Sequence, residues 1–290
     1  MSEVRIGITG GRGVLARSLQ TTWSEAEWIS FPGDIRNLSE VMDWVQAAGP
    51  LNALIHCAAM VPTRKVEQQP HAAFQTNVAG TCNILEAVRL IPKGTSRPWV
   101  FVGSTSHVYA TAQGHLSEDS PLVPVSLYGE TKLQAETWGR IYETKYGVPV
   151  CIGRIFSYSS PLQPESYFIP SLISKISMAP DAAVLEIPGL HGTRDFSKAA
   201  QISNTIRFLF EKQYCGTINI GNGSAVKLLD LAHHIKNQLG RQDVEIRALD
   251  TGTAHLCADI TKLRELGLNP KPSAESMIDE MISMRADQKS

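Results

Sequence analysis

The sequence predicts an α/β protein with a doubly wound parallel sheet, followed by a smaller region of mixed character. Short apolar runs rich in β-branched residues alternate with segments of helical periodicity from residue 4 to about residue 155. A glycine-rich turn follows the first of these runs directly. A loop rich in serine and proline begins at residue 157, and the later elements are shorter. We therefore expect the parallel sheet to be built mainly from the first half of the chain.

Composition indicates an ordinary globular protein and argues against several classes of partner. The 290 residues are 43% hydrophobic and 19% charged, and 27 Lys and Arg balance 28 Asp and Glu. No net field favours nucleic acid or an anionic membrane, and no apolar run approaches the roughly 20 residues of a membrane span. Five cysteines lack metal-ligand spacing, so we expect no metal site. The N-terminus lacks the regions of a signal peptide, and we expect a reduced, cytoplasmic protein.

The first strand is expected over 4–9 and leads into a turn suited to a dinucleotide. Strand, glycine turn and helix follow one another, which places a pyrophosphate at the helix N-terminus. Gly11, Gly13 and Ala16 fit the pattern GxGxxA, whereas Gly10, Gly13 and Ala16 fit GxxGxxA. Both patterns remain open at this point, as does a glycine turn without ligand. The residues predicted to contact the cofactor here are Gly10, Arg12, Gly13, Val14 and Leu15.

The second strand, expected over 27–31, lacks the acidic residue that often binds the adenosine ribose. That absence leaves room for a 2′-phosphate, which Arg12 and Arg36 could bind with planar guanidinium groups. We therefore favour NADPH over NADH, although two solvated arginines remain the alternative. Asp34, Ile35 and Arg36 resemble an adenine-contacting turn. Either Asn37 or Ser39 is expected to cap a helix running through residue 46.

The third strand is expected over 52–57 and is followed by a long helix. Cys57, Ala58 and Ala59 stand at the strand end, where small side chains would let the cofactor lie close. His56 lies inside the apolar run, and we expect a hydrogen-bonded core histidine. A helix is predicted over 72–90, with Asn77 reaching the backbone of the sheet. Its predicted apolar face comprises Phe74, Val78, Ile84, Leu85 and Val88.

The fourth strand, expected over 99–102, ends in a group of hydroxyl residues. Ser104, Thr105 and His107 emerge at its carboxyl end, which is where ligands bind in open α/β sheets. Thr105 or Ser104 could donate a hydrogen bond to a substrate carbonyl, the alternative being ordinary turn hydroxyls. His107 is either a substrate contact or a loop histidine without such a role.

A helix expected over 126–146 brings a phenol and an ammonium together. Tyr128 and Lys132 are four residues apart, so they project from one face. A phenol has a pKa near 10 in water, and a fixed cation in a dry cleft can lower that pKa by favouring phenolate. Such a pair can protonate a carbonyl oxygen as hydride reaches its carbon. A surface Tyr and Lys pair is the alternative interpretation.

Later elements are expected to mix helices and strands. A strand over 148–155 completes the alternating region. The remaining elements predicted are helices at 168–178, 198–210, 226–239, 260–266 and 275–285, and strands at 183–187 and 217–220.

These motifs together resemble the nucleotide-sugar branch of the extended short-chain dehydrogenase/reductase family over nearly the whole chain. The marks are Thr9 to Ala16, Asp34-Ile35, His56 to Ala59, Asn77, Gly103 to Thr105, Tyr128 with Lys132, Arg194 to Phe196, and Asn219 to Gly223. The resemblance implies a dinucleotide-binding Rossmann domain over 1–156, with late sheet elements near 188–221. It implies a mainly substrate-binding domain over 157–290 that closes on a nucleoside diphosphate sugar.

The resemblance also assigns roles to individual residues. Tyr128 matches the proton donor, and Lys132 matches the residue that lowers its pKa and holds the nicotinamide ribose. Thr105 occupies the hydroxyl position that orients the keto oxygen, and Arg194 matches an arginine that contacts the diphosphate. The cofactor set thus comprises Gly10, Arg12, Gly13, Val14, Leu15, Asp34, Ile35, Arg36, Cys57, Ala58, Ala59, Asn77, Tyr128 and Lys132, and the substrate set Ser104, Thr105, His107, Tyr128 and Arg194. A homodimer through the helices at 74–90 and 126–146 is also implied.

Departures from the family pattern narrow the expected reaction. Dehydratases of this family carry an acidic pair after the catalytic Thr, where this chain has Ser106 and His107. Ser157 replaces an asparagine common after the fifth strand. We therefore expect an NADPH-dependent reductase of a nucleotide-linked 4-keto-6-deoxyhexose. An NAD-dependent 4-epimerase, and a non-catalytic cofactor-binding subunit like that of methionine adenosyltransferase, remain open.

Overall fold

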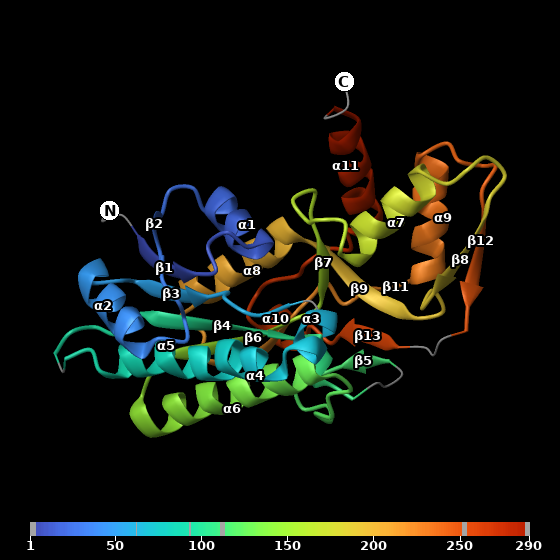
Figure 1. Ribbon diagram of the computed structural model, residues 1–290. Helices are drawn as coiled ribbons and strands as arrows, with labels where there is room; N and C mark the ends of the chain where they lie inside the picture. The colour runs from blue at the N-terminus through green and yellow to red at the C-terminus, as the bar shows by residue number, and fades with distance from the viewer. Residues whose placement is uncertain (1–3, 62, 93, 111–113, 251–253, 288–290) are drawn as a thin grey trace. The chain divides into compact units, whose positions relative to one another are not determined.

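The computed structural model describes residues 4–61, 63–92, 94–110, 114–250 and 254–287 (Figure 1). Its contacts gather into two compact units. Unit 1 is formed from Met1–Ala110, Glu118–Ile155 and Ile202–Ile220, and unit 2 from Thr111–Ser117, Phe156–Gln201 and Gly221–Ser290. The chain therefore passes between the units several times. The return of 202–220 to unit 1 falls within the late segment near 188–221 that was expected there, whereas 111–117 was expected in the first domain and belongs to unit 2.

Unit 1 contains a six-stranded, wholly parallel sheet, so the predicted fold class is confirmed. Its strands are β1 (Arg5–Thr9), β2 (Glu27–Ser30), β3 (Ala53–His56), β4 (Trp99–Thr105), β6 (Val150–Ile155) and β10 (Gly216–Ile220). Their order is β2-β1-β3-β4-β6-β10, and every pairing is parallel. The winding direction reverses between β1 and β3, and the carboxyl ends at such a switch point form the binding crevice of open α/β sheets.

Helices cover both faces of this sheet (Figure 1). α2 (Leu38–Ala48), α5 (Gly80–Arg89) and α6 (Leu127–Tyr146) pack on one face, where their apolar residues share a core with β3, β4 and β6. α1 (Val14–Thr22) and α8 (Ala199–Glu211) lie on the other face. Because both faces are covered, the central strands β3 and β6 are buried along their whole length instead of alternating, with His56 and Arg154 as buried polar exceptions in otherwise apolar strands.

Two helices begin at residues whose side chains cap them, and Asn37 is one of the two caps predicted for α2. Asn37 caps α2, and its side chain accepts from the backbone N–H groups of Ser39 and Glu40. Ser126 caps α6 by accepting from the Gly129 N–H at 3.2 Å. Gly147, with φ +65°, ends α6 in the left-handed conformation that glycine adopts readily. Local side-chain chemistry thus fixes where the Tyr128 helix begins and ends.

The helix predicted over 72–90 is interrupted by a π-helical turn. It consists of α4 (Pro70–Phe74), η1 (Gln75–Ala79) and α5, and α3 (Thr63–Gln68) precedes it. Phe74 is 48% exposed, so its assignment to the apolar face is wrong. A π turn holds more residues than an α turn and rotates the preceding side chains relative to the later ones.

Unit 2 is built on a small mixed sheet. β9 (Thr193–Lys198) is its centre and pairs with β11 (Ala225–Lys227), β13 (His255–Ala258) and β7 (Ser157–Ser159), and β13 also pairs with β5 (His115–Leu116). A separate ribbon joins β8 (Val184–Pro188) to β12 (Glu245–Leu249). The helices are α7 (Phe168–Ser177), α9 (Leu228–Gln238), α10 (Thr261–Glu265) and α11 (Ala274–Asp287). Of the late elements expected near 188–221, β10 joins the main sheet and β9 does not.

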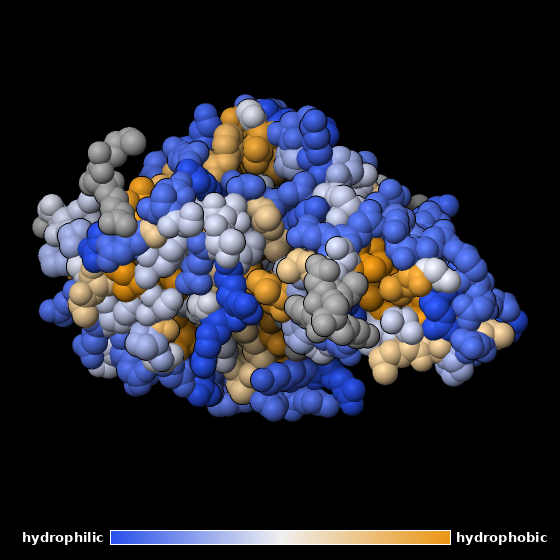
Figure 2. Space-filling view, turned by 90° about the horizontal axis from the view of Figure 1, so that it is seen from above, coloured by the Kyte–Doolittle hydropathy of each residue, from blue (hydrophilic) through white to orange (hydrophobic). Residues whose placement is uncertain are grey.

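The surface carries mostly polar side chains on the face shown in Figure 2, with hydrophobic ones in separate groups. Within the described part of the chain, no helix combines the length and apolar character needed to cross a membrane.

Candidate functional site

The switch point of the unit 1 sheet brings the glycine turn against the end of β3. Gly10 has φ +67°, and a Cβ on it would lie 2.8 Å from the Ala58 backbone nitrogen. A side chain there would push the two strand ends apart. Cys57, Ala58 and Ala59 are partly exposed at this end of β3. Gly10 therefore lets the turn pack closely against the end of β3, and that a cofactor lies against these small residues stays a prediction.

The geometry decides between the two glycine patterns. Gly13 is the N-cap of α1 and donates its N–H to the Gly10 carbonyl at 2.8 Å, while Ala16 is fully buried. Gly10, Gly13 and Ala16 therefore take the three structural positions, which corresponds to GxxGxxA. No side chain caps α1 among the described residues, so its first N–H groups and the positive end of its dipole can receive an anion.

His56 is a core histidine, as predicted. Its Nδ1 lies 2.7 Å from the Thr9 hydroxyl and its Nε2 3.0 Å from the Thr81 hydroxyl. Thr81 donates to the Asn77 carbonyl, so its oxygen accepts from Nε2–H, and Thr9 then donates to Nδ1. Burial, reinforced by the Lys132 charge, lowers the His56 pKa to about 3. His56 is neutral and holds the ends of β1 and β3 together.

Asn77 links three elements from within the π-helical turn. Its Oδ1 accepts from the Met60 N–H at 2.6 Å, and its Nδ2 donates to the Met60 carbonyl and the Thr131 hydroxyl. The side chain is fully buried. Asn77 thus reaches backbone just beyond β3, and its amide positions that segment against α6 from inside the protein.

The two arginines predicted near the adenosine differ in their surroundings. Arg36 donates from Nε and Nη2 to the Asp34 carboxylate, and this contact lowers the Asp34 pKa to about 2. Arg12 is exposed and has no hydrogen bond or ion pair among the described residues. Ile35 is buried against Gly80 of α5. Arg12 is therefore the guanidinium available to an added phosphate.

The structure separates the roles of Ser104 and Thr105 at the end of β4. Ser104 donates its hydroxyl to Glu136 Oε1 at 2.6 Å. Thr105 Oγ1 accepts from the His107 N–H, and within the described chain its own proton has no acceptor. Thr105 is therefore the hydroxyl with a free proton for a ligand oxygen.

A glycine lets α6 approach this strand end closely. A Cβ on Gly129 would lie 2.3 Å from the His107 carbonyl oxygen, so only glycine fits. As a result the neighbouring Tyr128 ring lies edge-on to the His107 imidazole, with 5.8 Å between ring centroids. Tyr128 is partly exposed. The structure thus brings together the phenol and the loop that carries Thr105.

Lys132 is the most unusual group in unit 1. The residue is 3% exposed, and within the described part of the chain its ammonium makes no hydrogen bond or ion pair. The nitrogen itself keeps some contact with solvent, because the fully buried side-chain nitrogen left without a partner among the described residues is Trp44 Nε1. Burial lowers its pKa to about 8, partly offset by Cys57 and Glu136. A buried ammonium without a partner is costly unless a ligand supplies hydrogen-bond acceptors. This observation points to an occupant with hydroxyl or other oxygen groups.

Arg194, predicted as a diphosphate contact, lies on β9 in unit 2. Its Nη1 donates to the Ala254 and Thr193 carbonyls. The neighbouring Asp195 is fully buried and accepts from the backbone N–H groups of Asn222, Gly223 and Ala258.

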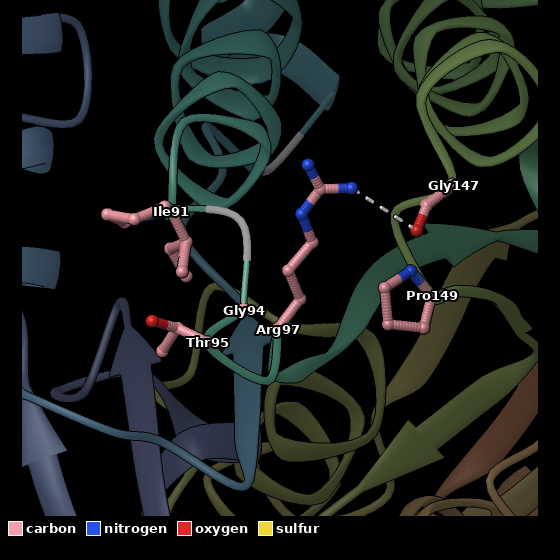
Figure 3. Close-up of a pocket in the computed structure, with 7 residues that line it drawn as sticks. Ile91, Gly94, Thr95, Arg97, Gly147 and Pro149 are labelled. Atoms are coloured by element: carbon pink, nitrogen blue, oxygen red, sulfur yellow. Dashed lines mark hydrogen bonds between the residues drawn. The ribbon is translucent and has the colours of Figure 1, made fainter.

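A hollow of about 500 Å³ in unit 1 lies where α5 and α6 end and β4 and β6 begin, at the amino ends of these strands (Figure 3). It is lined by Ile91, Pro92, Gly94, Thr95, Arg97, Gly147 and Pro149. Arg97 donates to the Arg89, Tyr146 and Gly147 carbonyls at the ends of α5 and α6. Its guanidinium caps two helices, so the hollow is no competitor to the strand-end site.

Glu136, which is fully buried one turn beyond Lys132 on α6, is a residue that was not predicted from the sequence. The spacing of four residues from Lys132 was the signal that could have revealed it.

Comparison with known proteins gives consistent relationships. The family model described as GDP-mannose 4,6 dehydratase matches residues 15–281. UDP-glucuronic acid decarboxylase 6 of Arabidopsis thaliana is 26% identical over 93% of this chain and 85% of its own length. The UDP-glucose epimerase YtcB of Bacillus subtilis, itself uncharacterised, is 30% identical over 66% of this chain and 60% of its own length. RMD from Pseudomonas aeruginosa, solved with NADPH, superposes with a TM-score of 0.86 at 20% identity, covering 98% of this chain and 99% of RMD.

Proposed function

Because the chain belongs to the extended short-chain dehydrogenase/reductase family of nucleotide-sugar enzymes, in the group whose model is described as GDP-mannose 4,6 dehydratase, we propose that it is a nicotinamide-dependent reductase of a nucleotide-linked keto-sugar. The observation that carries the proposal is the unpartnered, buried Lys132 ammonium one turn from Tyr128. The substrate is a nucleoside diphosphate 4-keto-6-deoxyhexose, and the product is the corresponding alcohol.

The residues present fit a dinucleotide. Gly10 has no room for a side chain beside Ala58, so the turn stays tight. The α1 N-terminus receives the pyrophosphate, and Lys132 binds the ribose hydroxyls of the nicotinamide half. Asp34, Ile35 and Arg36 form the adenosine side, with Val14, Leu15 and the small residues 57–59 as walls. Asn77 contributes indirectly, through Met60 and Thr131. When bound, the reduced dinucleotide supplies the hydride.

Side chains of the protein supply the proton that the keto oxygen receives. Thr105 donates a hydrogen bond to the keto oxygen, and Tyr128 transfers its phenolic proton to that oxygen as it becomes an alkoxide. The Lys132 charge lowers the pKa of the phenol, which brings the proton within reach near neutral pH. His107 lies beside the phenol and contacts the sugar, and Arg194 binds the diphosphate with its planar fork.

Two features bear on the reaction type. Ser106, which is buried, and His107 replace the acidic pair of the dehydratases, which leaves no carboxylate there to remove a proton for water elimination. The 30% identity with YtcB favours a second candidate, a 4-epimerase that retains its dinucleotide. Solved structures of this fold hold NADPH in one case and NAD in another. Unpaired Arg12 supports NADPH here.

The test is a panel of 4-keto-6-deoxy sugar nucleotides with NADPH and with NADH, followed at the nicotinamide absorbance, with UDP-glucose and UDP-glucuronic acid assayed for product by NMR. We expect net oxidation of NADPH by at least one keto-sugar. Interconversion of UDP-sugars without net oxidation would support the epimerase instead. A co-purifying enzyme, with no turnover on any sugar nucleotide, would support a regulatory subunit.

A homodimer through the helices at 74–90 and 126–146 is part of the proposal. Phe74, Trp138 and Tyr146 are 42–48% exposed on these segments, which is unusual for large aromatic residues. Light scattering is expected to give twice the chain mass, and a monomeric mass would remove this part.

A further inference from the structure

A fully buried network of charged and polar groups lies behind the Tyr128–Lys132 pair in unit 1. Glu136 is 0% exposed, and its carboxylate accepts from Arg154 Nη2 at 2.8 Å and Nε at 3.0 Å. Ser104 donates to the same carboxylate at 2.6 Å, and Arg140 from the next turn of α6 at 3.2 Å. Both oxygens of Glu136 are therefore held in fixed positions.

The Arg154 guanidinium makes further hydrogen bonds through Nη1. Its Nη1 donates to the Tyr109 hydroxyl at 3.0 Å and to the Glu118 carbonyl at 2.8 Å. Tyr109 in turn donates to Asn219 on β10 at 2.5 Å. The network thus connects α6, β4, β6 and β10, and its donors and acceptors are matched. Such a network fixes the orientation of the carboxylate instead of leaving it to relax.

Glu136 stands in one stripe of α6 with the proposed catalytic groups. Tyr128, Lys132 and Glu136 follow one another at intervals of four residues, so they lie on neighbouring turns. Through Ser104, the same carboxylate also holds the residue next to Thr105. One side chain therefore contacts the strand that presents the hydroxyl and lies one turn from the ammonium.

Two groups oppose the effect of burial on the Lys132 pKa, Cys57 first and then Glu136. Of the neighbours at the end of β3, burial keeps Cys57 a thiol, with a pKa raised to about 12, and His56 neutral, with a pKa lowered to about 3. On α6 itself the neighbours are Tyr128 and Glu136. Attraction by Glu136 opposes the effect of burial on the Lys132 pKa. Arg154 and Arg140 both pair with this carboxylate, at 2.8 and 3.2 Å, and Arg154 also donates to the Tyr109 hydroxyl.

We propose that Glu136 is a positioning residue, whose buried carboxylate keeps the Lys132 ammonium charged and fixes the Ser104–Thr105 strand end against the Tyr128 helix. The inference rests on the proposed function, because there the Lys132 charge lowers the pKa of the Tyr128 phenol. It goes beyond that function by adding a carboxylate, behind the reacting groups, that touches neither cofactor nor substrate.

The experiment measures Lys132 ionisation without using turnover. A base with a depressed pKa in the folded state destabilises the ligand-free protein below that pKa, so stability rises as the pH passes upward through it. For the wild type we expect this rise to begin near pH 8. In Glu136→Gln we expect the onset to move about one pH unit lower. Glu136→Asp keeps the charge and is expected to keep the onset. The matched control is Glu143→Gln, which removes a carboxylate farther along the same helix.

A second readout uses the reaction. The alkaline limb of kcat is expected to move down in Glu136→Gln by the same interval, with KM changed much less. If Glu136→Gln does not fold because Arg154 is left unpaired, the double variant E136Q/R154Q removes both charges and is expected to show the same displacement.

The outcomes separate the inference from the proposed function. An unchanged onset in a folded Glu136→Gln or double variant would show that the carboxylate is only structural. A displaced onset without turnover on any sugar nucleotide would leave the positioning role intact and overturn the proposed reaction. Persistence of the rise in Lys132→Met would show that another group titrates, and would overturn the inference.

Discussion

Two buried ionisable groups, one in each unit, are treated in opposite ways by the protein. Asp195 in unit 2 accepts three backbone hydrogen bonds, from Asn222, Gly223 and Ala258, and is fully buried. Lys132 in unit 1 is almost as buried but has no hydrogen bond within the described residues. The Asp195 carboxylate thus receives its hydrogen bonds from unit 2 itself. The Lys132 ammonium receives none from the described chain, and we expect a bound ligand to supply the acceptors.

The difference shows how to interpret two motifs that the sequence alone makes look alike. Both Arg194-Asp195-Phe196 and Tyr128 to Lys132 are family marks, and each contains a charged residue that ends up buried. A satisfied carboxylate stabilises the turn it binds, and its loss is expected to affect folding. An unsatisfied ammonium destabilises the empty protein, and its purpose is expected in binding and chemistry.

The largest effect is expected from Tyr128→Phe. The variant keeps the ring and its contact with His107 but removes the proton that the keto oxygen receives. Turnover is expected to fall by about 10²–10⁴-fold, the usual contribution of a general acid. Dinucleotide affinity, measured by fluorescence titration, is expected to stay within about twofold, because the ring still fills its place. Unchanged turnover would remove the phenol from the chemistry.

Asp195→Ala tests the satisfied side of the comparison. Three backbone N–H groups lose their acceptor, so the free energy of unfolding is expected to fall by about 3 kcal/mol in urea denaturation. Asp250→Ala, an exposed carboxylate in the same unit, is the control and is expected to change little. Equal stabilities of the two variants would show that burial and hydrogen bonding at Asp195 carry no stability.

Lys132→Met tests the ammonium that has no hydrogen bond in the described part of the chain, and here the free energy of unfolding is expected to rise instead of fall. The folded pKa of about 8 lies below the ordinary 10.5, so the charge opposes folding fully below pH 8, and this penalty disappears as the pH rises toward 10.5. At pH 7 the variant is expected to be more stable than the ligand-free wild type by about 2 kcal/mol, while losing turnover. A less stable variant would mean that the ammonium is satisfied after all.

The smallest effect is expected at the cofactor's outer edge. Arg12→Ser removes the unpaired guanidinium near the glycine turn. The preference for NADPH over NADH, expressed as the ratio of dissociation constants, is expected to fall about tenfold, because a charge-assisted contact to the 2′-phosphate is lost. Arg17→Ser on the exposed side of α1 is the matched control. The same ratio in both variants would refute the assignment of Arg12.

Much of unit 1 was predictable because its signals are local. Apolar β-branched runs gave the strands of the parallel sheet, and Asn37 and Ser126 cap their helices through bonds to residues two or three positions away. The pairing of Tyr128 with Lys132 also follows from helix geometry alone. His56 was predictable as a core residue, because it lies within an apolar run.

Tertiary structure decided whatever depends on partners distant in the chain. Ser104 and Thr105 are equivalent hydroxyls in the sequence. In the structure Ser104 donates its proton to Glu136 of α6, whereas the Thr105 proton has no acceptor within the described chain. Gly10 is the position in the turn that requires glycine, because a Cβ there would clash with the Ala58 backbone. Phe74 turned outward, because a π-helical turn altered the periodicity on which its assignment relied. Sequence by itself therefore determined the strands of the parallel sheet in unit 1 and which polar residues follow them. Folding decided which polar groups are available to a ligand. The reason is that some donors form hydrogen bonds with segments distant in the chain, whereas others do not.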